Sequence, residues 1–386
     1  MSHLGYMEKL LDGVEVEWKS LSDIATITIG DFVHKNNQDS SAKYPVYNGG
    51  ISPTGYYEKY NNTGNKIIVS ARGANAGFVN RISQPYWAGN SCYSVGVKNS
   101  AEINWTYVFY FLKNAENKLI GDQQKGGIPA VSKKQMEVFQ IPIPSLNIQA
   151  EIVRILDTFT ELTAELTAEL TARQQQYAYY RDQLLTFEEG DVEWKALGEV
   201  GEVRMCKRIL KSQTSDEGDI PFYKIGTFGK EPDAYITREL FNEYRAKYNY
   251  PQTGEVLISA SGTIGRTVIF DGQDAYFQDS NIVWIENDEN KVLNKYLFYF
   301  YKVVNWNVAE GGTIKRLYNN NLRKIMIPIP SLVEQKRIVA ILDKFDALTT
   351  SLTEGLPREI ELRQQQYEYY RDLLLSFPKP EVVAHD

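Results

Sequence analysis

The sequence predicts an α+β protein in which two α/β globular domains are separated by two long helices that form an antiparallel coiled coil. Three observations predict this architecture. The chain of 386 residues repeats itself once, two segments have an extended helical periodicity, and the segments between them contain short apolar strings separated by turns. We place the domains and helices at 1–144 (first globular domain), 145–189 (central helix), 190–330 (second globular domain) and 331–386 (C-terminal helix and tail).

An internal repeat divides the chain into two halves. IPIPSLNIQAEIVRILDTF at 141–159 returns as IPIPSLVEQKRIVAILDKF at 327–345, and RQQQYAYYRDQLLTF at 173–187 returns as RQQQYEYYRDLLLSF at 363–377. Between these strings the halves match more weakly but in the same order. Near-identical helices beside divergent globular segments indicate that the helices share one structural role, whereas the globular segments do similar work on different targets.

The two near-identical segments have the periodicity of long amphipathic helices. Pro144 and Ser145 are typical of a helix start, because proline is tolerated just outside a helix and serine is a good N-cap. The string Gly355-Leu356-Pro357 should break or kink the second helix before it resumes. Matching apolar stripes favour a coiled coil within the chain over two separate amphipathic core helices. The first stripe consists of Ile148, Ile152, Ile155, Phe159, Leu162, Leu166 and Leu170.

A tandem tetrapeptide distinguishes the first helix from the second. TAEL occurs at 163–166 and again at 167–170. The second segment nevertheless has four more residues between Phe345 and its RQQQ string than the first has between Phe159 and its own. Four helical residues add about 6 Å along a helix axis. The tandem can therefore act as a ruler between the globular domains, or simply extend a solvated helix of high helix propensity.

The globular segments predict short strands and short helices. Apolar and β-branched strings predict the strands, and clusters rich in glycine and asparagine between them predict turns. The strands are KIIVSA, CYSVGV, EVLISA and NIVWIE, which begin at residues 66, 92, 255 and 281. The aromatic strings at 105–112 and 294–301 predict short helices that belong to the core.

The charge distribution restricts the class of partner. The net charge of −7 by itself disfavours nucleic acid, but the excess acid is concentrated in the helices: residues 146–190 hold 3 basic and 8 acidic side chains. A nucleic acid would therefore need local basic loops and a basic partner. The only cysteines, Cys92 and Cys206, are far apart and predict a reducing cytoplasm without disulfides. No apolar run approaches twenty residues, so no association with a membrane is expected.

The sequence contains no pattern typical of a catalytic centre. The three histidines, His3, His34 and His385, have no cysteine or histidine at metal-ligand spacing. Both the Gly-x-x-x-x-Gly-Lys-Ser/Thr phosphate loop and the Asn/Asp-Pro-Pro-aromatic string of amino-group DNA methyltransferases are missing. The IPIP strings are interpreted as punctuation at the ends of strands. SARGANAG at 70–77 and SASGTIGR at 259–266 are interpreted as tight loops that bring backbone close to a surface.

The combined pattern resembles the specificity subunits of type I restriction-modification systems. The strings VRILDTFTELTAEL, QQQYAYYRDQLL, VEWK and GLPREIELRQQQYEYYRDLLLSFPKPE are nearly diagnostic, and the TAEL tandem is similar to that of the IC branch. The resemblance covers essentially the whole chain. The variable domains match the target-recognition domains of the family only in pattern, as in IVSARGANAG.

This resemblance implies a DNA-binding, non-catalytic subunit in the cytoplasm. Each variable domain would bind one half of a bipartite site on double-stranded DNA, and the coiled coil with its TAEL tandem would set the gap between the half-sites. Two methyltransferase (M) subunits would use S-adenosylmethionine to methylate adenine N6 after base flipping. Restriction (R) subunits would use ATP and Mg²⁺ to translocate and cleave DNA. The resemblance assigns none of these cofactors to the present chain.

Candidate DNA contacts follow from residue type and predicted loop position. Base edges are contacted by Arg, Lys, Asn, Gln or Ser on surface loops, and phosphates by Lys or Arg. The candidates of the first domain are Ser70, Arg72, Asn75 and Lys125, followed by Lys35, Asn36 and Asn37. The candidates of the second domain are Lys207, Arg208 and Lys211, followed by Ser261, Thr263 and Arg266 and then by Lys315 and Arg316.

Two other functions are compatible with parts of the sequence. An interaction scaffold, with two docking domains on a coiled-coil spacer, would explain the net charge of −7 without DNA. A self-contained DNA methyltransferase would have to lack the usual cofactor and catalytic motifs. The pairs Tyr179-Tyr180 and Tyr369-Tyr370 are expected to pack in the coiled coil or against partner subunits and not on bases.

Overall fold

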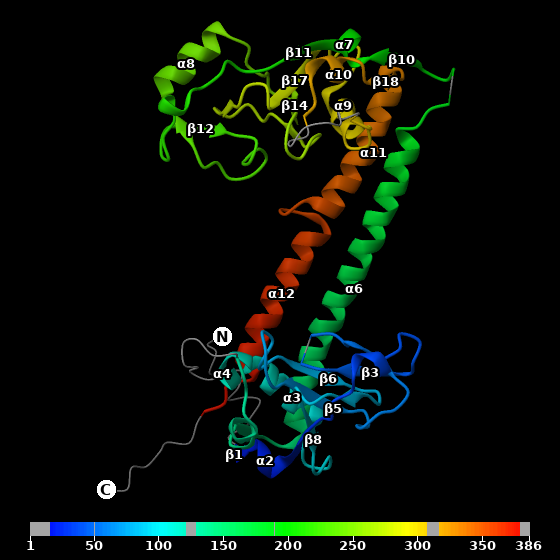
Figure 1. Ribbon diagram of the computed structural model, residues 1–386, viewed down its shortest axis with the longest axis vertical. Coiled ribbons are helices and arrows are strands. Elements are labelled where there is room, and N and C mark those ends of the chain that lie inside the picture. Colours follow the sequence, from blue (N-terminus) through cyan, green and yellow to red (C-terminus); the bar gives the residue numbers. More distant parts are fainter. Residues whose placement is uncertain (1–15, 50, 121–128, 189, 307–315, 379–386) are drawn as a thin grey trace. The chain divides into compact units, whose positions relative to one another are not determined.

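The computed structural model describes residues 16–49, 51–120, 129–188, 190–306 and 316–378 (Figure 1). The chain divides into two compact units, and each is described by itself. Unit 1 contains the chain up to Thr167 together with the chain from Glu359 onward, and unit 2 contains Ala168–Arg358.

Unit 1 combines three small sheets with short helices. Its strands are β1 (Glu17–Ser20), β2 (Ala25–Ile29), β3 (Tyr44–Tyr47), β4 (Gly55–Tyr57), β5 (Lys66–Ser70), β6 (Val79–Ile82), β7 (Trp87–Ala88), β8 (Cys92–Val97) and β9 (Gln140–Ile143). Its helices are α2 (Leu21–Ile24), the 3-10 helix η1 (Lys35–Asn37), α3 (Trp105–Asn114), α4 (Glu116–Ile120) and α5 (Lys133–Glu137). The sheets have the orders β2-β8-β5-β6, β4-β3-β7 and β1-β9.

Unit 2 repeats this arrangement. Its strands are β10 (Glu193–Ala196), β11 (Gly201–Arg204), β12 (Ile220–Tyr223), β13 (Tyr235–Ile236), β14 (Val256–Ser259), β15 (Thr267–Ile269), β16 (Tyr276–Phe277), β17 (Ile282–Asn287) and β18 (Met326–Ile329). Its short helices are α7 (Leu197–Val200), the 3-10 helix η2 (Lys211–Gln213), α8 (Arg238–Lys247), α9 (Asn294–Tyr301) and α10 (Asn319–Arg323). The sheets have the orders β11-β17-β14-β15, β13-β12-β16 and β10-β18, so the strands and aromatic helices predicted from the sequence are confirmed.

The long helices predicted from the repeat are present in both units. They are α6 (Leu146–Leu184), α11 (Leu332–Thr350) and α12 (Gly355–Leu374). In unit 1, Phe159 of α6 stacks on Tyr370 of α12 with ring centroids 5.3 Å apart. In unit 2, Tyr180 of α6 stacks on Phe345 of α11 at 5.8 Å. Early residues of α6 thus contact the end of the C-terminal region and late residues contact its beginning, which is the antiparallel order.

The second helical region is broken as predicted, but the break occupies residues 351–354, immediately before the string Gly355-Leu356-Pro357. Gly355 begins α12 with a φ of +75°, and a side chain there would collide with the carbonyl oxygens of Ala347 and Leu348. Pro357 lies in the first turn of α12, where its missing N–H removes no helix hydrogen bond. The four extra residues of this region are therefore accommodated by a turn.

Each globular domain is closed by a pair of short strands that joins its beginning to its end. Trp18 of β1 lies opposite Pro142 of β9, and Trp194 of β10 lies opposite Pro328 of β18. The VEWK strings form the first strand of each pair and the IPIP strings form the second. The interpretation of IPIP as punctuation after a strand is therefore wrong. Proline is tolerated because the strand has a neighbour on one side only.

The long helices are anchored to the domains through the core. Ile152 and Leu156 of α6 are fully buried in the unit 1 core, and Ile338 and Leu342 of α11 are fully buried in the unit 2 core.

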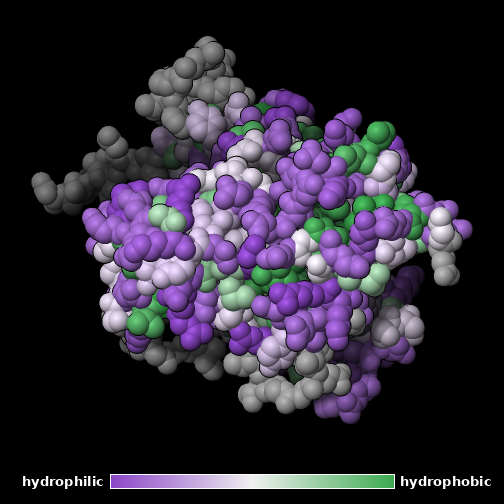
Figure 2. Space-filling model, turned by 90° about the horizontal axis from the view of Figure 1, so that it is seen from above, coloured by the Kyte–Doolittle hydropathy of each residue, from purple (hydrophilic) through white to green (hydrophobic). Residues whose placement is uncertain are grey.

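Among the described residues, no helix is long and apolar enough to cross a membrane. The face drawn in Figure 2 is mostly hydrophilic, with small separate apolar groups.

Candidate nucleic-acid interface

In unit 1, the ends of three strands meet at one edge of the four-stranded sheet. Ile29, the last residue of β2, lies opposite Tyr93 of β8. Ser70, the last residue of β5, lies opposite Cys92, the first residue of β8. Because antiparallel neighbours run in opposite directions, the chain leaves β2 and β5 and enters β8 at the same edge. The loops that contain the predicted contacts of unit 1 therefore emerge side by side.

Unit 2 has the same arrangement of strand ends. Arg204, the last residue of β11, lies opposite Trp284, and Ser259, the last residue of β14, lies opposite Ile282, the first residue of β17. The loops after β11 and β14 therefore emerge beside the loop before β17. We name the two groups by their residues: the unit-1 loop cluster is 30–37, 71–78, 89–91 and 129–131, and the unit-2 loop cluster is 206–213, 260–266, 278–281 and 316–318.

A segment from later in the chain is hydrogen-bonded to each glycine-rich loop. A backbone bridge joins Arg72 to Ala130 in unit 1, and the equivalent bridge joins Ser261 to Arg316 in unit 2. The next residue of each later segment donates its N–H to the glycine-rich loop at 2.8 Å. In both units, the structure therefore places a glycine-rich loop next to a downstream segment. The sequence indicated each of these segments but not that they are neighbours.

The exposed candidates of unit 1 lie on two of these loops. Arg72 and Asn75 are exposed on the glycine-rich loop, where Gly73 and Gly77 have φ values of +92° and +83°. These conformations favour glycine and keep the loop tight. The other exposed candidates, Lys35, Asn36 and Asn37, form η1.

Two candidates of unit 1 do not contribute to the described surface. Ser70 is completely buried because β5 is a central strand with both faces covered. Its hydroxyl cannot contact a duplex outside the domain, and the prediction for its side chain is corrected accordingly. Lys125 lies outside the described residues.

In unit 2, three basic candidates are exposed after β11. They are Lys207, Arg208 and Lys211, the last of which begins η2. The guanidinium Nε of Arg208 donates to Oδ2 of Asp279 at 2.9 Å, and the Lys207 ammonium lies 5.1 Å from the ring centre of Tyr248. The carboxylate and the ring orient the two cations at the surface.

The glycine-rich loop of unit 2 presents one hydroxyl and buries another. Thr263 is exposed at the tip. Ser261 is buried, and its hydroxyl donates to Oδ1 of Asn281 at 2.9 Å. Ser261 therefore holds the 278–281 loop in place, and the prediction of a direct contact by this side chain is corrected.

The arginines of the unit-2 loop cluster also support neighbouring loops. Arg266 donates to the carbonyl oxygen of Phe228 at 2.9 Å, and Arg316 donates to that of Ser280 at 3.2 Å. Both side chains remain half-exposed, so each can present further N–H groups to a ligand. Lys315 lies outside the described residues.

Sequence reasoning missed the 278–281 loop and the residue Phe32. Asp279, Ser280 and Asn281 each hold a predicted contact residue, although no basic side chain marks them. The turn-forming string QDSN, with Ser280 at a φ of +54°, is the signal that was available. Phe32 is exposed in the unit-1 loop cluster. It was not selected because its side chain has no charge and no hydrogen-bonding group.

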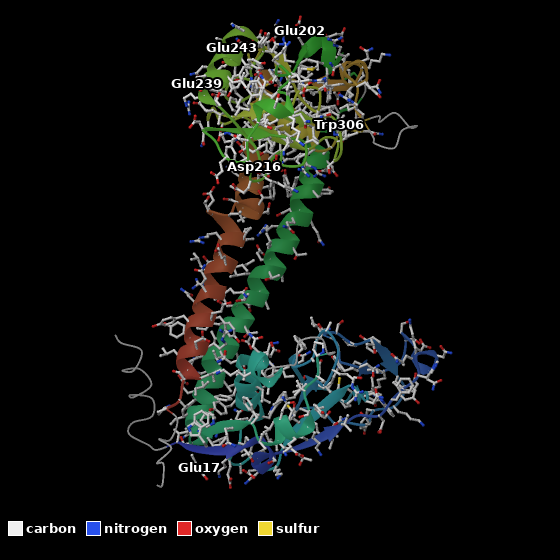
Figure 3. All side chains as sticks on the ribbon, turned by 60° about the vertical axis from the view of Figure 1, so that its left-hand side comes forward. Glu17, Glu202, Asp216, Glu239, Glu243 and Trp306 are labelled. Carbon is white, nitrogen blue, oxygen red and sulfur yellow. The ribbon has the colours of Figure 1, made fainter. Side chains whose placement is uncertain are left out.

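Unit 2 also contains α8, which has no helical counterpart among the described residues between β4 and β5 of unit 1. Glu239 and Glu243 lie on its exposed side (Figure 3). Its arginines, Arg238 and Arg245, pair with Asp274 at 2.7 and 3.1 Å. Because this face presents both signs of charge, α8 is a poorer surface for phosphates than the unit-2 loop cluster.

The side chains of the two loop clusters are suited to recognising a ligand. Burial raises the pKa of the Cys92 thiol to about 11 and that of Cys206 to about 12, so both stay protonated at neutral pH and are poor nucleophiles. Within the described ranges, no three His, Cys, Asp or Glu side chains are grouped so that they could hold a metal ion. What the loops offer is hydrogen-bond donors and positive charge.

Comparisons with known proteins agree with this repeated geometry. The family model described as the type I restriction modification DNA specificity domain matches residues 13–173 and again residues 189–362. The chain is 51% identical over 387 residues to a Haemophilus influenzae protein described as a type I restriction enzyme specificity subunit, with 96% of this chain and 98% of the relative covered. It is 36% identical over 416 residues to the EcoR124I/EcoR124II specificity subunit of Escherichia coli, with 100% of both chains covered.

The fold is also similar to solved structures. The crystal structure of a type I restriction-modification system S subunit from M. genitalium aligns with a TM-score of 0.63 at 17% identity, covering 95% of this chain and 98% of that one. A chain from a structural study of complex assembly in the type I R-M system aligns with a TM-score of 0.55 at 16% identity, covering 93% and 97%. At these identities the likeness concerns the fold.

Proposed function

The chain belongs to the type I restriction-modification DNA specificity family as a non-catalytic specificity subunit, and from this premise we propose that it reads a bipartite site on double-stranded DNA. Each loop cluster contacts one half-site. The observation that carries the proposal is the convergence, at the same sheet edge of both units, of loops that differ in their exposed side chains.

The exposed side chains divide into two kinds of contact. Arg72 and Asn75 suit the edges of guanine and adenine, because a guanidinium can bond guanine O6 and N7 and an amide can bond adenine N6 and N7. Lys35 and Lys211 occupy equivalent 3-10 helices and suit phosphates. Phosphate contacts set the register of each domain on the duplex, and base contacts supply its sequence preference.

The long helices set the distance between the half-sites in this proposal. The two TAEL repeats at 163–170 lie inside the continuous helix α6. One tetrapeptide adds about 6 Å to a helix, which is close to the length of two base-pair steps. The number of repeats would therefore determine the gap between the half-sites.

Partner subunits perform the chemistry. Two methyltransferase subunits with S-adenosylmethionine would methylate adenine N6, and restriction subunits with ATP and Mg²⁺ would translocate and cleave DNA, all in the cytoplasm. The exposed tyrosines of the long helices support such docking, since aromatic side chains are enriched at protein interfaces. These tyrosines stand at equivalent positions of the repeat: Tyr179 and Tyr180 on α6, and Tyr369 and Tyr370 on α12.

Sequencing of modified bases tests the proposal directly. In cells that express the chain with its methyltransferase subunit, we expect N6-methyladenine within one bipartite motif, and exchange of residues 20–140 for those of another family member should change one half-site only. Methylation without a bipartite motif, or a change in both half-sites together, contradicts the proposal. The scaffold alternative, which the net charge of −7 favours, predicts that the assembled complex shows no salt-sensitive retention of duplex DNA.

A further inference from the structure

An exposed phenylalanine occupies a matched position in the unit-1 loop cluster. Residues 20–48 align without a gap with residues 196–224, which places Phe32 opposite Arg208 and η1 opposite η2. Phe32 is 66% exposed, and the Arg208 side chain is 67% exposed. The same place on the two frameworks therefore presents an apolar ring in unit 1 and a cation in unit 2.

The structure holds Phe32 in its exposed position. The N–H of Asp31 donates to the carbonyl oxygen of Ala88 at 2.9 Å, and Nε1 of Trp87 donates to the carbonyl oxygen of Asp31 at 2.7 Å. On the other side of Phe32, the side chain of Val33 is buried. With both neighbours fixed, the ring remains at the surface instead of folding into the core.

A second contact fixes the chain just beyond the ring. The imidazole Nδ1 of His34 accepts the N–H of Asn36 at 3.2 Å and so caps η1. The rings of Phe32 and His34 meet edge to face with centroids 6.2 Å apart. A large apolar side chain that is held in water in this way contributes favourably to the free energy only when a ligand covers it and removes its surface from water.

We propose that Phe32 recognises a thymine in the half-site of unit 1 through the 5-methyl group of that base. The inference rests on the proposed function, since it requires this cluster to face the major groove. Phenylalanine has no hydrogen-bonding group, so it cannot distinguish the donor and acceptor patterns of the bases. The thymine methyl is the apolar group that a base pair presents in the major groove, and it is absent from the minor groove.

The contrast with Arg208 supports this assignment. Arg208, held by Asp279, presents N–H groups that suit an acceptor such as guanine O6 or N7. Having the phenylalanine of one framework where the other has an arginine exchanges a polar preference for an apolar one at matched positions, each of which follows the matching strand of its sheet.

Duplexes that lack single methyl groups test the proposal. With the full chain in complex with its methyltransferase subunits, and with the motif known, each thymine of both half-sites is replaced in turn by deoxyuridine, and affinity is measured by fluorescence anisotropy. We expect one replacement, in the half-site of unit 1, to weaken binding roughly fourfold, the effect of about one buried methyl group. In Phe32→Ala the same replacement should have less than about half that effect on a logarithmic scale, and Phe32→Leu should restore part of it.

Arg208→Ala is the matched control. This variant should bind more weakly overall but keep the wild-type ratio between the thymine and deoxyuridine duplexes. The proposal is overturned if no deoxyuridine replacement in the half-site of unit 1 weakens binding, or if the ratio is unchanged in Phe32→Ala. A change in DNA bending by Phe32→Ala without a change in that ratio also overturns it, because that result would identify a wedge between base steps. A complex that binds all duplexes alike contradicts the proposed function itself.

Discussion

The two units share a framework and differ in the loops that it supports. Gln149 in unit 1 and Gln335 in unit 2 are fully buried near the start of a long helix, and each side chain makes three hydrogen bonds to the main chain of its own unit. Tyr107 and Tyr296 donate to the carbonyl oxygen of the first proline in their IPIP strands at 2.8 and 2.9 Å. The frameworks therefore match in these individual polar contacts.

The loop clusters differ at positions that the same framework supports. Unit 1 presents Asp31 and Phe32 where unit 2 presents Lys207 and Arg208. The bridges at Arg72 and Ser261 are main-chain bonds, so this part of the support does not depend on which side chains the loops bear. The comparison teaches that the loops can change their target while these main-chain bridges stay in place.

Removing the buried glutamines should have the largest effect. Replacing Gln149 by Leu leaves one N–H and two carbonyl groups of the main chain without their partner, and we expect the free energy of unfolding to fall by about 3 kcal/mol. Gln335→Leu should cost the same within about 1 kcal/mol, because its contacts are the same. Urea unfolding of the two variants measures both values.

The exposed Gln183 of α6 provides the control for this pair. Gln183→Leu should change stability by less than about 0.5 kcal/mol. Clearly unequal losses in Gln149→Leu and Gln335→Leu would show that the two frameworks are energetically different in spite of their matched contacts.

The charge difference between the clusters predicts a difference in salt dependence. Lys207→Ala should make the negative slope of log affinity against log salt shallower by about 0.9, the value of one phosphate contact. It should also weaken binding severalfold. Asp31→Ala, at the matched position, should strengthen binding because it removes a carboxylate that repels phosphates. Anisotropy titrations of the complex between about 50 and about 200 mM salt measure these slopes.

Lys247 of α8 is the control for the salt experiment, because it is basic and exposed but pairs with Glu243 at 3.0 Å outside the cluster. Lys247→Ala should leave the slope unchanged. If Lys207→Ala and Lys247→Ala behave alike, the unit-2 loop cluster is not the surface that holds the phosphates.

Much of the fold could be predicted because periodicity and repetition are local signals. The long helices, the break just before Gly355 and the strands of the central sheets follow from apolar spacing, glycine and proline. The pairing of VEWK with IPIP could not be predicted, because the pairs are four residues long and join segments about a domain apart. The helix α8 was missed because charged side chains interrupt its few apolar positions.

The site was predictable as loops but not as individual contacts. Glycine and basic residues marked the loops correctly, since tight turns and phosphate contacts need those residue types. Burial decides which side chains are available, and it depends on neighbouring strands: Ser70 and Ser261 look like Arg72 in sequence context but are buried. The role of Asp279 could not be predicted, because Asp279 orients Arg208, which is far away in the sequence and close in space.

One difference lies inside the frameworks, where β14 is preceded by Glu255 and β5 begins with Lys66 at the matched position. Lys66 donates to Oδ1 of Asn62 at 3.2 Å. Glu255 is buried and accepts the N–H of Gln252 at 2.6 Å. Burial raises the pKa of the Glu255 carboxyl to about 6, so its charge opposes folding at neutral pH.

Glu255→Gln should produce the smallest effect, and one confined to unit 2. Because the folded-state pKa lies above the unfolded value, the ionised carboxylate destabilises the fold above about pH 6, and the penalty disappears as pH falls below the unfolded pKa. The variant should therefore be more stable than the wild type by about 1 kcal/mol near pH 7.5 and nearly equal to it near pH 4.5. Glu255→Leu, which also loses the acceptor for Gln252, should gain less at the higher pH. If urea midpoints of Glu255→Gln and the wild type stay parallel between the two pH values, the buried charge does not distinguish the frameworks, and their difference lies wholly in the loops.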